Sequence, residues 1–296
     1  MIIVRLSGGM GNQMFQYAIG RALSLKHNTV LKLDLTFLEH RIKLPHFMRP
    51  NFNFRNFDLD VFNINAEIAK PEDISFWNRP IGGGKLMLIF DAILRKLAFL
   101  PGWEKSFSYD KTFLTFGPDI YLQGFWQSEK YFLDYKEQIR EDFRLRRQLP
   151  PESQELFDEI KNTNSLCVHL RRMHGGGSFH GKYDMEYYKN GIKRITETKT
   201  IDKIYVFSDD IKWCKENIKF FQPTFFVEEK YAGVKAEGHL ILMSACKHFV
   251  ISNSTFSWWA AWLARDENKI VVAPQKWFKN SSTDTKDLIP ETWIRI

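Results

Sequence analysis

The second half of the chain alternates short apolar runs with segments of helical periodicity, and this alternation restricts the possible folds more than any other feature. We predict strands at 166–170, 203–207, 224–227, 248–252 and 269–272, with helices between them at 185–196, 211–217, 238–247 and 256–265. Strands that alternate with helices usually pair in parallel, because each helix returns the chain to the same end of the sheet. The sequence therefore predicts an α/β domain with a parallel sheet.

The beginning of the chain predicts a second domain of the same class. A buried strand at 2–6, a glycine turn at 7–11, a helix at 12–25 and a strand at 29–33 form a Rossmann-like opening. The segment Gly9-Met10-Gly11-Asn12-Gln13-Met14 lacks the third glycine of the dinucleotide fingerprint, which argues against a nicotinamide dehydrogenase. The turn is either purely structural or, through the amides of Asn12 and Gln13, a contact for a sugar.

A length of 296 residues suits two domains, and the best boundary is the segment 148–154, which carries two prolines in a polar setting. We predict domains at 1–150 and 151–296. Three cysteines without Cys-x-x-Cys spacing indicate neither a disulfide framework nor a thiolate zinc site, so we expect a reducing cytoplasm. We expect the chain to begin with its first strand and to carry no leader and no transmembrane segment.

The net charge of +7 favours anionic partners without choosing between nucleic acid, a membrane surface and a nucleotide sugar. Residues 85–100 have helical spacing of apolar side chains with Arg95 and Lys96 on the polar side. Such a helix either packs on its own domain or rests on the inner face of a membrane, and both interpretations stay open. The amide and aromatic side chains of 121–131, Trp126 and Gln127 among them, suit a sugar platform, although the aromatic ones are equally typical of a core.

The segment 165–177 carries the strongest chemical signal, because a strand there ends in His169, Leu170, Arg171 and Arg172 before three glycines. Two adjacent guanidinium groups repel each other, and arginine holds phosphate oxygens through paired hydrogen bonds. The pair therefore favours a dianionic partner such as a diphosphate. Salt bridges at a strand end are the alternative.

Two further strand-to-helix junctions carry polar side chains at the edge where open α/β sheets bind ligands. At the first, Ser208, Asp209 and Asp210 either cap the following helix or hold a metal, and we favour capping. At the second, hydroxyl and amide side chains of 252–257 precede a helix, whose free N–H groups suit a phosphate. We expect Trp258, Trp259 and Trp262 to belong to the core of that helix rather than to stack on a ligand.

Four segments together resemble the bacterial α-1,2-fucosyltransferases of glycosyltransferase family 11. They span nearly the whole chain in family order: Arg5-Leu-Ser-Gly-Gly-Met-Gly-Asn-Gln-Met-Phe-Gln-Tyr17, Gln123-Gly-Phe-Trp-Gln-Ser-Glu-Lys-Tyr131, Val168-His-Leu-Arg-Arg172, and Leu242-Met-Ser-Ala-Cys-Lys-His248 with Asn253-Ser-Thr-Phe-Ser-Trp-Trp-Ala-Ala-Trp-Leu263. The resemblance implies a GT-B architecture of two Rossmann-like domains that face each other across a cleft. It also implies inverting transfer of L-fucose from GDP-fucose to the 2-hydroxyl of a galactoside, without a metal or other cofactor, in surface-glycan assembly.

The resemblance also implies roles for individual residues. Arg171 would stabilise the leaving diphosphate, Arg172 would support it, and His169 would lie beside the guanine or ribose. The donor-binding set that we predict is completed by Ser208, Asp209, Asn253, Ser254, Thr255, Ser257, Gly9, Gly11 and Asn12. The acceptor, a lipid-linked or soluble galactose-containing oligosaccharide, would contact Gln13, Trp126 and Gln127. Nucleic acid is not an expected partner.

Two positions depart from the family pattern. His174 stands where the family usually has an aspartate, and His239 stands near the place where related enzymes use an acid to accept guanine N–H groups. A neutral histidine has one acceptor nitrogen and cannot receive two such bonds, although Glu237 could substitute. A different donor sugar or nucleotide therefore stays an alternative. A catalytically silent carbohydrate- or nucleotide-binding protein is a second one.

Overall fold

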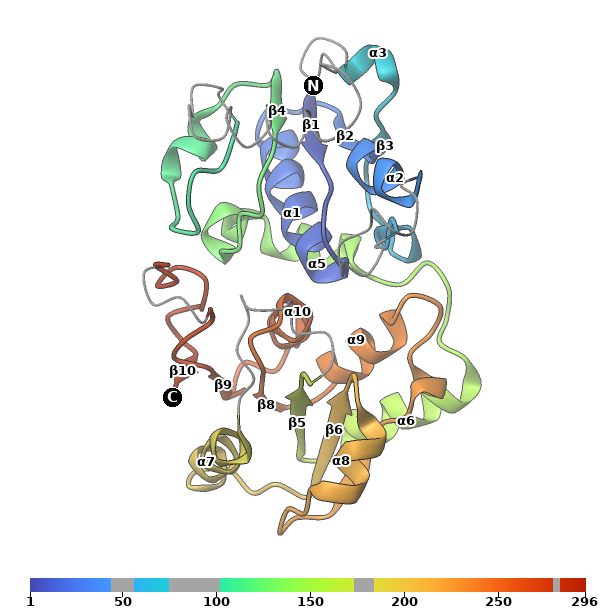
Figure 1. Cartoon of the computed structure of the whole chain (residues 1–296), viewed down its shortest axis with the longest axis vertical. Coiled ribbons are helices and arrows are strands. Elements are labelled where there is room, and N and C mark those ends of the chain that lie inside the picture. The colour runs from blue at the N-terminus through green and yellow to red at the C-terminus, as the bar shows by residue number, and fades with distance from the viewer. Residues whose placement is uncertain (44–55, 75–101, 173–183, 279–282) are drawn as a thin grey trace. The chain divides into compact units, whose positions relative to one another are not determined.

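The chain forms two compact units that are each built on a parallel sheet (Figure 1). The structure, a computed structural model, describes residues 1–43, 56–74, 102–172, 184–278 and 283–296. The first unit comprises Met1–Arg144 with Lys286–Leu288, and the second comprises Leu145–Thr285 with Ile289–Ile296. The first unit thus ends a few residues before position 150 and includes a short piece of the C-terminal segment. The predicted helix at 85–100 lies outside the described residues.

The first unit carries a four-stranded sheet in the order β3-β2-β1-β4, with all its pairs parallel. Its elements are β1 (Ile2–Arg5), α1 (Met10–Lys26), β2 (Leu31–Asp34), α2 (Thr36–Lys43), β3 (Glu67–Ile68), α3 (Pro71–Ile74), β4 (Ile120–Leu122) and α5 (Lys136–Asp142). The carboxyl ends of β1, β2 and β4 therefore lie at one edge of the sheet.

Glycines set both the close packing of α1 on the sheet and the shape of the turn that precedes it. A side chain at Gly20 would place its Cβ 2.4 Å from Val4 Cγ2 and 2.8 Å from Leu31 Cδ1, so the helix backbone lies almost directly on both strands. Gly8 has a φ of 76°, a left-handed conformation that favours glycine. The turn after β1 therefore has little conformational freedom.

The second unit carries a six-stranded parallel sheet in the order β10-β9-β8-β5-β6-β7. Its elements are α6 (Pro151–Asn162), β5 (Ser165–Leu170), α7 (Met185–Thr196), β6 (Lys203–Ser208), α8 (Ile211–Asn217), β7 (Thr224–Phe226), α9 (Glu237–Ser244), β8 (His248–Val250), α10 (Thr255–Leu263), β9 (Val271–Ala273) and β10 (Ile294–Arg295). The predicted parallel sheet is confirmed, and the predicted bounds of α7 and α8 match the observed ones.

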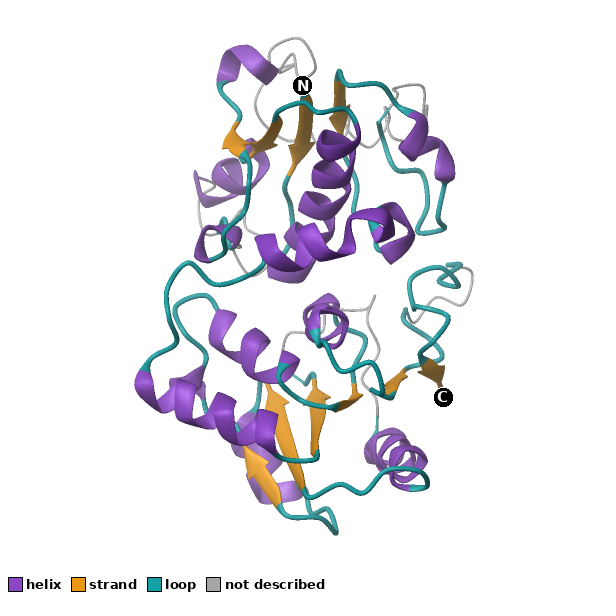
Figure 2. Ribbon diagram, turned by 180° about the vertical axis from the view of Figure 1, so that it is seen from behind, coloured by secondary structure: helices purple, strands orange, loops and turns teal. Residues whose placement is uncertain are grey.

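Side chains of the central strand β5 alternate between the two faces of this sheet, and Figure 2 shows helices on both sides of it. Leu166, Val168 and Leu170 belong to one buried cluster with side chains of α7 and α8. His169 points to the opposite face, where its ring lies 6.4 Å from that of Phe256 in α10. The alternation therefore directs His169 toward the helix that follows β8.

The segment 148–154, predicted as a linker, contains the beginning of a helix. Pro150 is the N-cap of α6 and Pro151 is its first residue. Proline is tolerated there because the first N–H groups of a helix have no partner within it. Of the predicted boundary segment, only residues 148–150 therefore lie outside α6.

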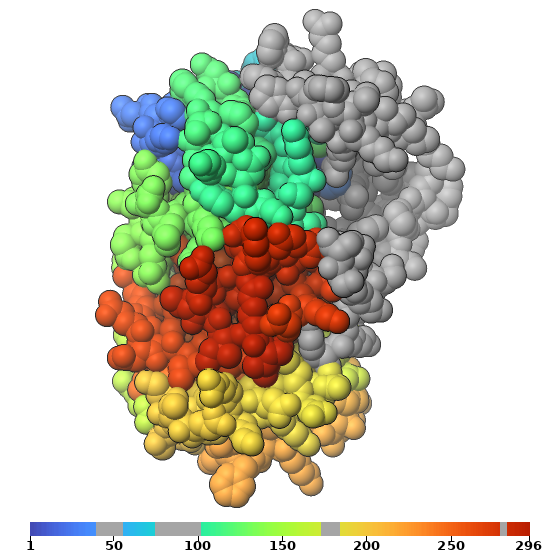
Figure 3. All heavy atoms as spheres, turned by 90° about the vertical axis from the view of Figure 1, so that its left-hand side faces the viewer, coloured from blue at the N-terminus to red at the C-terminus, as the bar shows by residue number. Residues whose placement is uncertain are grey.

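The C-terminal residues of the second unit lie directly against α7, as the space-filling view shows in red and yellow (Figure 3). The final strand β10 pairs with β9 at the edge of the sheet. Throughout the described part of the chain, the helices are all too short or too polar to cross a membrane.

Candidate functional site

Three strand ends of the second unit meet at the carboxyl edge of its sheet. Strands β8, β5 and β6 are parallel neighbours, so the residues that follow each strand lie side by side. These residues are Arg171 and Arg172 after β5, Asp209 and Asp210 after β6, and 252–254 after β8. The structure therefore brings together the three junctions that the sequence singled out.

Arg171 faces the start of α10. Its Nη1 lies 3.3 Å from the hydroxyl of Ser254, the N-cap residue of that helix, and this hydroxyl does not cap the helix. A helix N-terminus carries roughly half a positive charge, concentrated on its free N–H groups. Arg171 and the N-terminus of α10 therefore bring two sources of positive charge to one place. The arrangement is therefore suited to a phosphate group.

Arg172 is held by the chain itself. Its backbone N–H donates to Asp209 Oδ1 at 2.7 Å, and its Nε lies 3.5 Å from Asp210 Oδ2. Its guanidinium carbon lies 3.3 Å from the centre of the Trp213 ring, a close cation–π contact. The two adjacent arginines therefore have different surroundings, and only Arg171 reaches the helix N-terminus.

The acidic pair serves the local backbone. Asp210 is the N-cap of α8 and accepts from the N–H of Trp213 at 3.3 Å, while Ser208 Oγ accepts from the N–H of Asp210 at 3.1 Å. The capping interpretation is confirmed for Asp210. Within the described ranges, no group of three or more His, Cys, Asp or Glu side chains is arranged to hold a metal ion.

His169 is buried and neutral at physiological pH. Its Nδ1 lies 2.8 Å from the hydroxyl of Ser252. Burial, and to a lesser extent the neighbouring positive charge of Arg171, lower the pKa of His169 to about 3. A neutral imidazole offers one donor and one acceptor, so it can bind a polar group without adding charge.

The remaining predicted residues after β8 line the start of α10. Asn253 is buried and its Nδ2 donates to the carbonyl of Trp277 at 3.1 Å, while Ser257 is buried and donates to backbone carbonyls of Ser252 and Ser254. Thr255 is partly buried at the first position of the helix. The three tryptophans that follow are buried, which confirms their prediction as core. Ligand contacts by this segment stay predictions.

The residues predicted in the first unit lie at the carboxyl edge of its own sheet. Gly9 is the N-cap of α1 and Gly11 lies buried in its first turn. Asn12 Oδ1 accepts from Gln127 Nε2 at 3.0 Å. Gln13 is fully buried: its Nε2 donates to the carbonyls of Gly8 and Asn56, and its Oε1 accepts from the N–H of Asp58. This geometry favours a structural role for Gln13, and its contact with an acceptor stays a prediction.

Glu104 is a residue of this edge that the sequence did not indicate. Its carboxylate accepts from the N–H of Phe125 at 2.6 Å and from that of Trp126 at 2.9 Å. Burial raises the pKa of Glu104 to about 7, and the two N–H groups oppose that rise. Glu104 lies in no periodic sequence pattern. An isolated bridge between Trp103 and Gln123 places Glu104 beside the end of β4.

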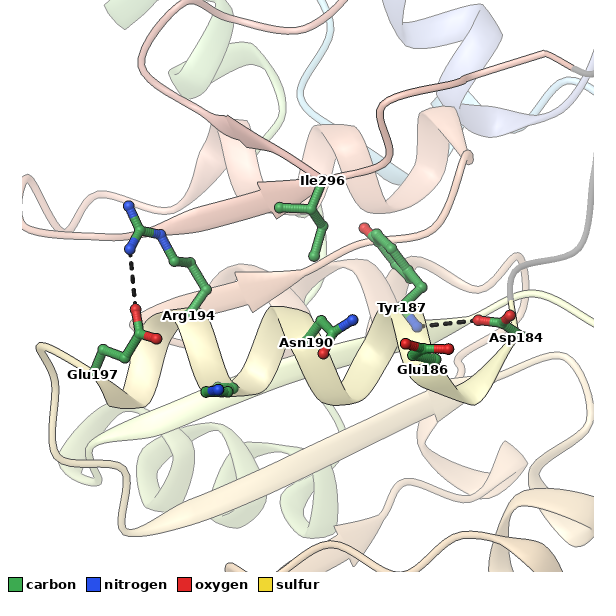
Figure 4. Close-up of a pocket in the computed structure, with 8 residues that line it drawn as sticks. Asp184, Glu186, Tyr187, Asn190, Arg194, Glu197 and Ile296 are labelled. Carbon is green, nitrogen blue, oxygen red and sulfur yellow. Dashed lines mark hydrogen bonds and ion pairs between the residues drawn. The ribbon is translucent and has the colours of Figure 1, made fainter.

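A hollow beside α7 is lined by none of the residues described above (Figure 4). It is lined by Asp184, Glu186, Tyr187, Asn190, Lys193, Arg194, Glu197 and Ile296. Arg194 pairs with Glu197 at 3.0 Å, and Asp184 caps α7 by accepting from the N–H of Tyr187. Its charged groups therefore largely serve the helix itself.

The two α/β units, each with a parallel sheet, form a fold of the GT-B type, and a central strand of the second unit ends in the arginine pair. The fold of the fucosyltransferase NodZ from Bradyrhizobium is similar, with a TM-score of 0.50, 14% identity, and coverage of 88% of this chain and 91% of that one. A cleft between the two units stays a prediction.

The chain belongs to glycosyl transferase family 11, whose family model matches residues 102–296. An alpha-1,2-colitosyltransferase of Escherichia coli is 35% identical over 100% of this chain and 99% of its own length. The O-antigen biosynthesis glycosyltransferase WbnK of Escherichia coli is 31% identical over 98% of this chain and 99% of its own length. The resemblance inferred from the four segments is thereby confirmed.

Replacing His169 tests its buried, neutral state. Because the folded pKa of His169 is about 3 and that of an unfolded histidine is about 6.5, only the unfolded chain gains a proton between those values. The free energy of unfolding should therefore fall as the pH drops below 6.5, by up to about 1.4 kcal/mol per pH unit from this group. We expect His169→Gln to lose this part of the acid sensitivity.

The measurement is urea unfolding of both proteins from pH 8 to pH 4. The difference between them should be constant above pH 7 and should shift in favour of the variant below pH 6. Parallel stability curves over the whole range would show that His169 titrates normally in the folded chain.

Proposed function

We propose that the chain is an inverting glycosyltransferase that moves a 6-deoxyhexose from a GDP-linked donor to the 2-hydroxyl of a galactoside. The observation that carries this proposal is the contact between Arg171 and the N-cap residue of α10 at the edge of the second sheet. Membership of family 11 supports glycosyl transfer. The linkage is supported by the similarity to the alpha-1,2-colitosyltransferase of Escherichia coli.

The chemistry follows from where charge develops. When the bond from the anomeric carbon to the diphosphate breaks, the departing nucleotide gains negative charge. A guanidinium and helix N–H groups that already point to that place stabilise the charge without reorganising at the moment of reaction. Arg171 and the start of α10 would supply this stabilisation. Arg172, held by Asp210 and Trp213, would keep the strand end in position.

The same surroundings support a reaction without a metal ion or other cofactor. A divalent cation in a glycosyltransferase would neutralise the diphosphate, and the arginine and helix terminus offer positive charge for that purpose. Asp209 accepts the N–H of Arg172 and Asp210 caps α8. We therefore assign both carboxylates to the architecture of the site.

Recognition of the nucleotide base would depend on the region around His239. Its Nε2 lies 3.0 Å from the carbonyl of Glu228 and therefore donates, which leaves Nδ1 as the single acceptor of the neutral ring. The carboxylate of Glu237 accepts from the N–H groups of Val234 and Lys235. One acceptor at His239 is consistent with guanine only if a second group receives the other N–H.

The donor sugar is either L-fucose or colitose. Fucose is suggested by the motifs of the α-1,2-fucosyltransferases, and colitose by the alpha-1,2-colitosyltransferase that is 35% identical. Colitose is L-fucose without its 3-hydroxyl group. A site that hydrogen-bonds a substrate hydroxyl rejects the analogue that lacks it by about 10⁴-fold or more, whereas an apolar pocket discriminates far less against an added hydroxyl.

We propose that the acceptor is a galactose-containing oligosaccharide, lipid-linked or soluble, in the assembly of a surface polysaccharide. The name of the WbnK relative, which refers to O-antigen biosynthesis, supports this role. The enzyme would then work in the cytoplasm, with peripheral contact to the inner face of the membrane where the acceptor carries a lipid. A silent binding protein is the competing hypothesis, and the retained Arg171 site argues against it.

Incubation with a panel of nucleotide sugars in EDTA tests the proposal. We expect GDP-fucose or GDP-colitose to be hydrolysed slowly alone and transferred to a galactoside when one is added, with UDP-, CMP- and dTDP-sugars inert. Mass spectrometry detects both products. Absence of any turnover would favour the silent binder, and turnover that needs magnesium or manganese would overturn metal independence.

Substitution of the two arginines tests their separate roles. Lysine keeps the charge but lacks the planar fork that grips two diphosphate oxygens. We expect Arg171→Lys to lower kcat at saturating donor by about a hundredfold or more, in line with the loss of one well-placed donor. Arg172→Lys should lower it less, because its surroundings are those of a structural residue.

Melting curves without ligand provide the control: Arg171→Lys should melt near the parent, whereas Arg172→Lys should melt somewhat lower, because lysine loses part of the contacts with Trp213 and Asp210. A kcat of Arg171→Lys within threefold of the parent would make Arg171 a structural residue and would remove the basis of the mechanism.

A further inference from the structure

Two loops of the first unit are joined by hydrogen bonds at the carboxyl edge of its sheet. One is the glycine turn after β1 and the other is the loop 123–127 after β4, and β1 and β4 are parallel neighbours. Gln16 joins the loops, because its Nε2 donates to the carbonyl of Gly124 at 2.8 Å and to the hydroxyl of Ser7 at 3.0 Å. Asn12 joins them again through Gln127.

The loop 123–127 has a fixed shape. Glu104 receives two consecutive N–H groups, those of Phe125 and Trp126, and Trp126 has a φ of 45°. A side chain at Gly124 would place its Cβ 2.4 Å from the Cβ of Glu104, so glycine is required there. The side chains of this loop are therefore held in place before any ligand arrives.

Four polar atoms of this loop lack hydrogen-bond partners among the described residues. They are Gln123 Nε2, Gln123 Oε1, Gln127 Oε1 and Trp126 Nε1, and all four are buried. Gln123 and Gln127 are each only 6% exposed. By contrast, the amide of Gln16, at the same edge, is bonded through both its nitrogen and its oxygen.

Buried polar atoms almost always have partners, because leaving one without a bond costs free energy. Three side chains of one loop share this defect, which indicates a partner that the described part of the chain does not supply. A primary amide presents a donor and an acceptor side by side. Neighbouring hydroxyls of a pyranose each donate and accept, so they match such an amide.

We propose that the loop 123–127 is the acceptor subsite and that Gln123 selects the acceptor by bonding two adjacent hydroxyls of its terminal sugar. Gln127 Oε1 accepts from a further hydroxyl. This inference rests on the proposed function, since it names the site for the second substrate of that reaction. A site whose polar groups stay unbonded without the right hydroxyls rejects sugars that lack them.

The test compares the parent with Gln123→Met, which keeps the length of the side chain and removes its polar atoms. Binding of methyl β-D-galactoside and its 3-, 4- and 6-deoxy analogues is followed by saturation-transfer NMR in the presence of GDP. Donor hydrolysis without acceptor is measured in parallel. We expect Gln123→Met to bind the galactoside at least tenfold more weakly, while donor hydrolysis stays within threefold of the parent.

The deoxy analogues give a second expectation. Removal of one of the two bonded hydroxyls should weaken binding to the parent about tenfold and should have little further effect in Gln123→Met, because the two losses concern the same interaction. Equal galactoside binding by parent and variant, or no binding of the galactoside by the parent, would overturn the proposal. Absence of donor hydrolysis in the parent would instead overturn the proposed function.

Gln16→Met is the matched control. It removes an amide that is fully bonded within the chain, so it should lower the melting temperature, whereas Gln123→Met should melt at or above the parent. A marked loss of stability in Gln123→Met with unchanged galactoside binding would identify a buried water site and overturn the proposal. Should Gln123→Met not fold, Gln123→Asn withdraws the amide by one methylene, and the same tenfold loss of binding is expected.

Discussion

The parallel pairing of β8, β5 and β6 is the constraint on which the candidate donor site depends. In this register Leu170 lies level with Ser208, and Val168 lies level with Val250. The residues after all three strands therefore emerge at one edge, although they are separated by 37 to 83 positions in the chain. A shift by one residue would turn His169 away from α10 and Leu170 out of the core.

Electrostatics then distinguishes the two adjacent arginines. Arg172 lies on Trp213 and beside Asp210, which together balance its charge and fix its position. Arg171 lies beside the hydroxyl of Ser254 and the positive end of α10, and the same positive charge helps to keep His169 neutral. One arginine therefore stabilises the strand end, and the other contributes to a site whose charge suits a diphosphate. The first unit, with its amide-rich loop after β4, offers complementary chemistry for uncharged hydroxyls.

Much of the second unit could be predicted from the sequence because its strands are continuous apolar runs between clear helical patterns. The strands β3 and β10 were missed, since two residues are too few to show a period, and β4 was not predicted either. Helix α6 was missed because two prolines stand at its start, where they are compatible with a helix.

The chemistry of single side chains was harder to predict than the location of the sites. The arginine pair and the cap at Asp210 follow from local sequence. The structural role of Gln13 depends on Asn56 and Asp58, which lie 43 and 45 positions away, and the position of Glu104 depends on a loop 21 positions away. Such contacts leave no periodic signal, and no local rule indicates which arginine turns toward Trp213.

The central claim is that Arg171 and the start of α10 bind the diphosphate of the donor. Calorimetric titration in EDTA with GDP and GMP, using the parent and Arg171→Gln, tests it most directly. The account predicts that the parent binds GDP at least about tenfold more tightly than GMP, a difference of about 1.4 kcal/mol, and that Arg171→Gln loses most of this preference. Equal affinity of the parent for GDP and GMP, or a preference that survives in Arg171→Gln, would contradict it.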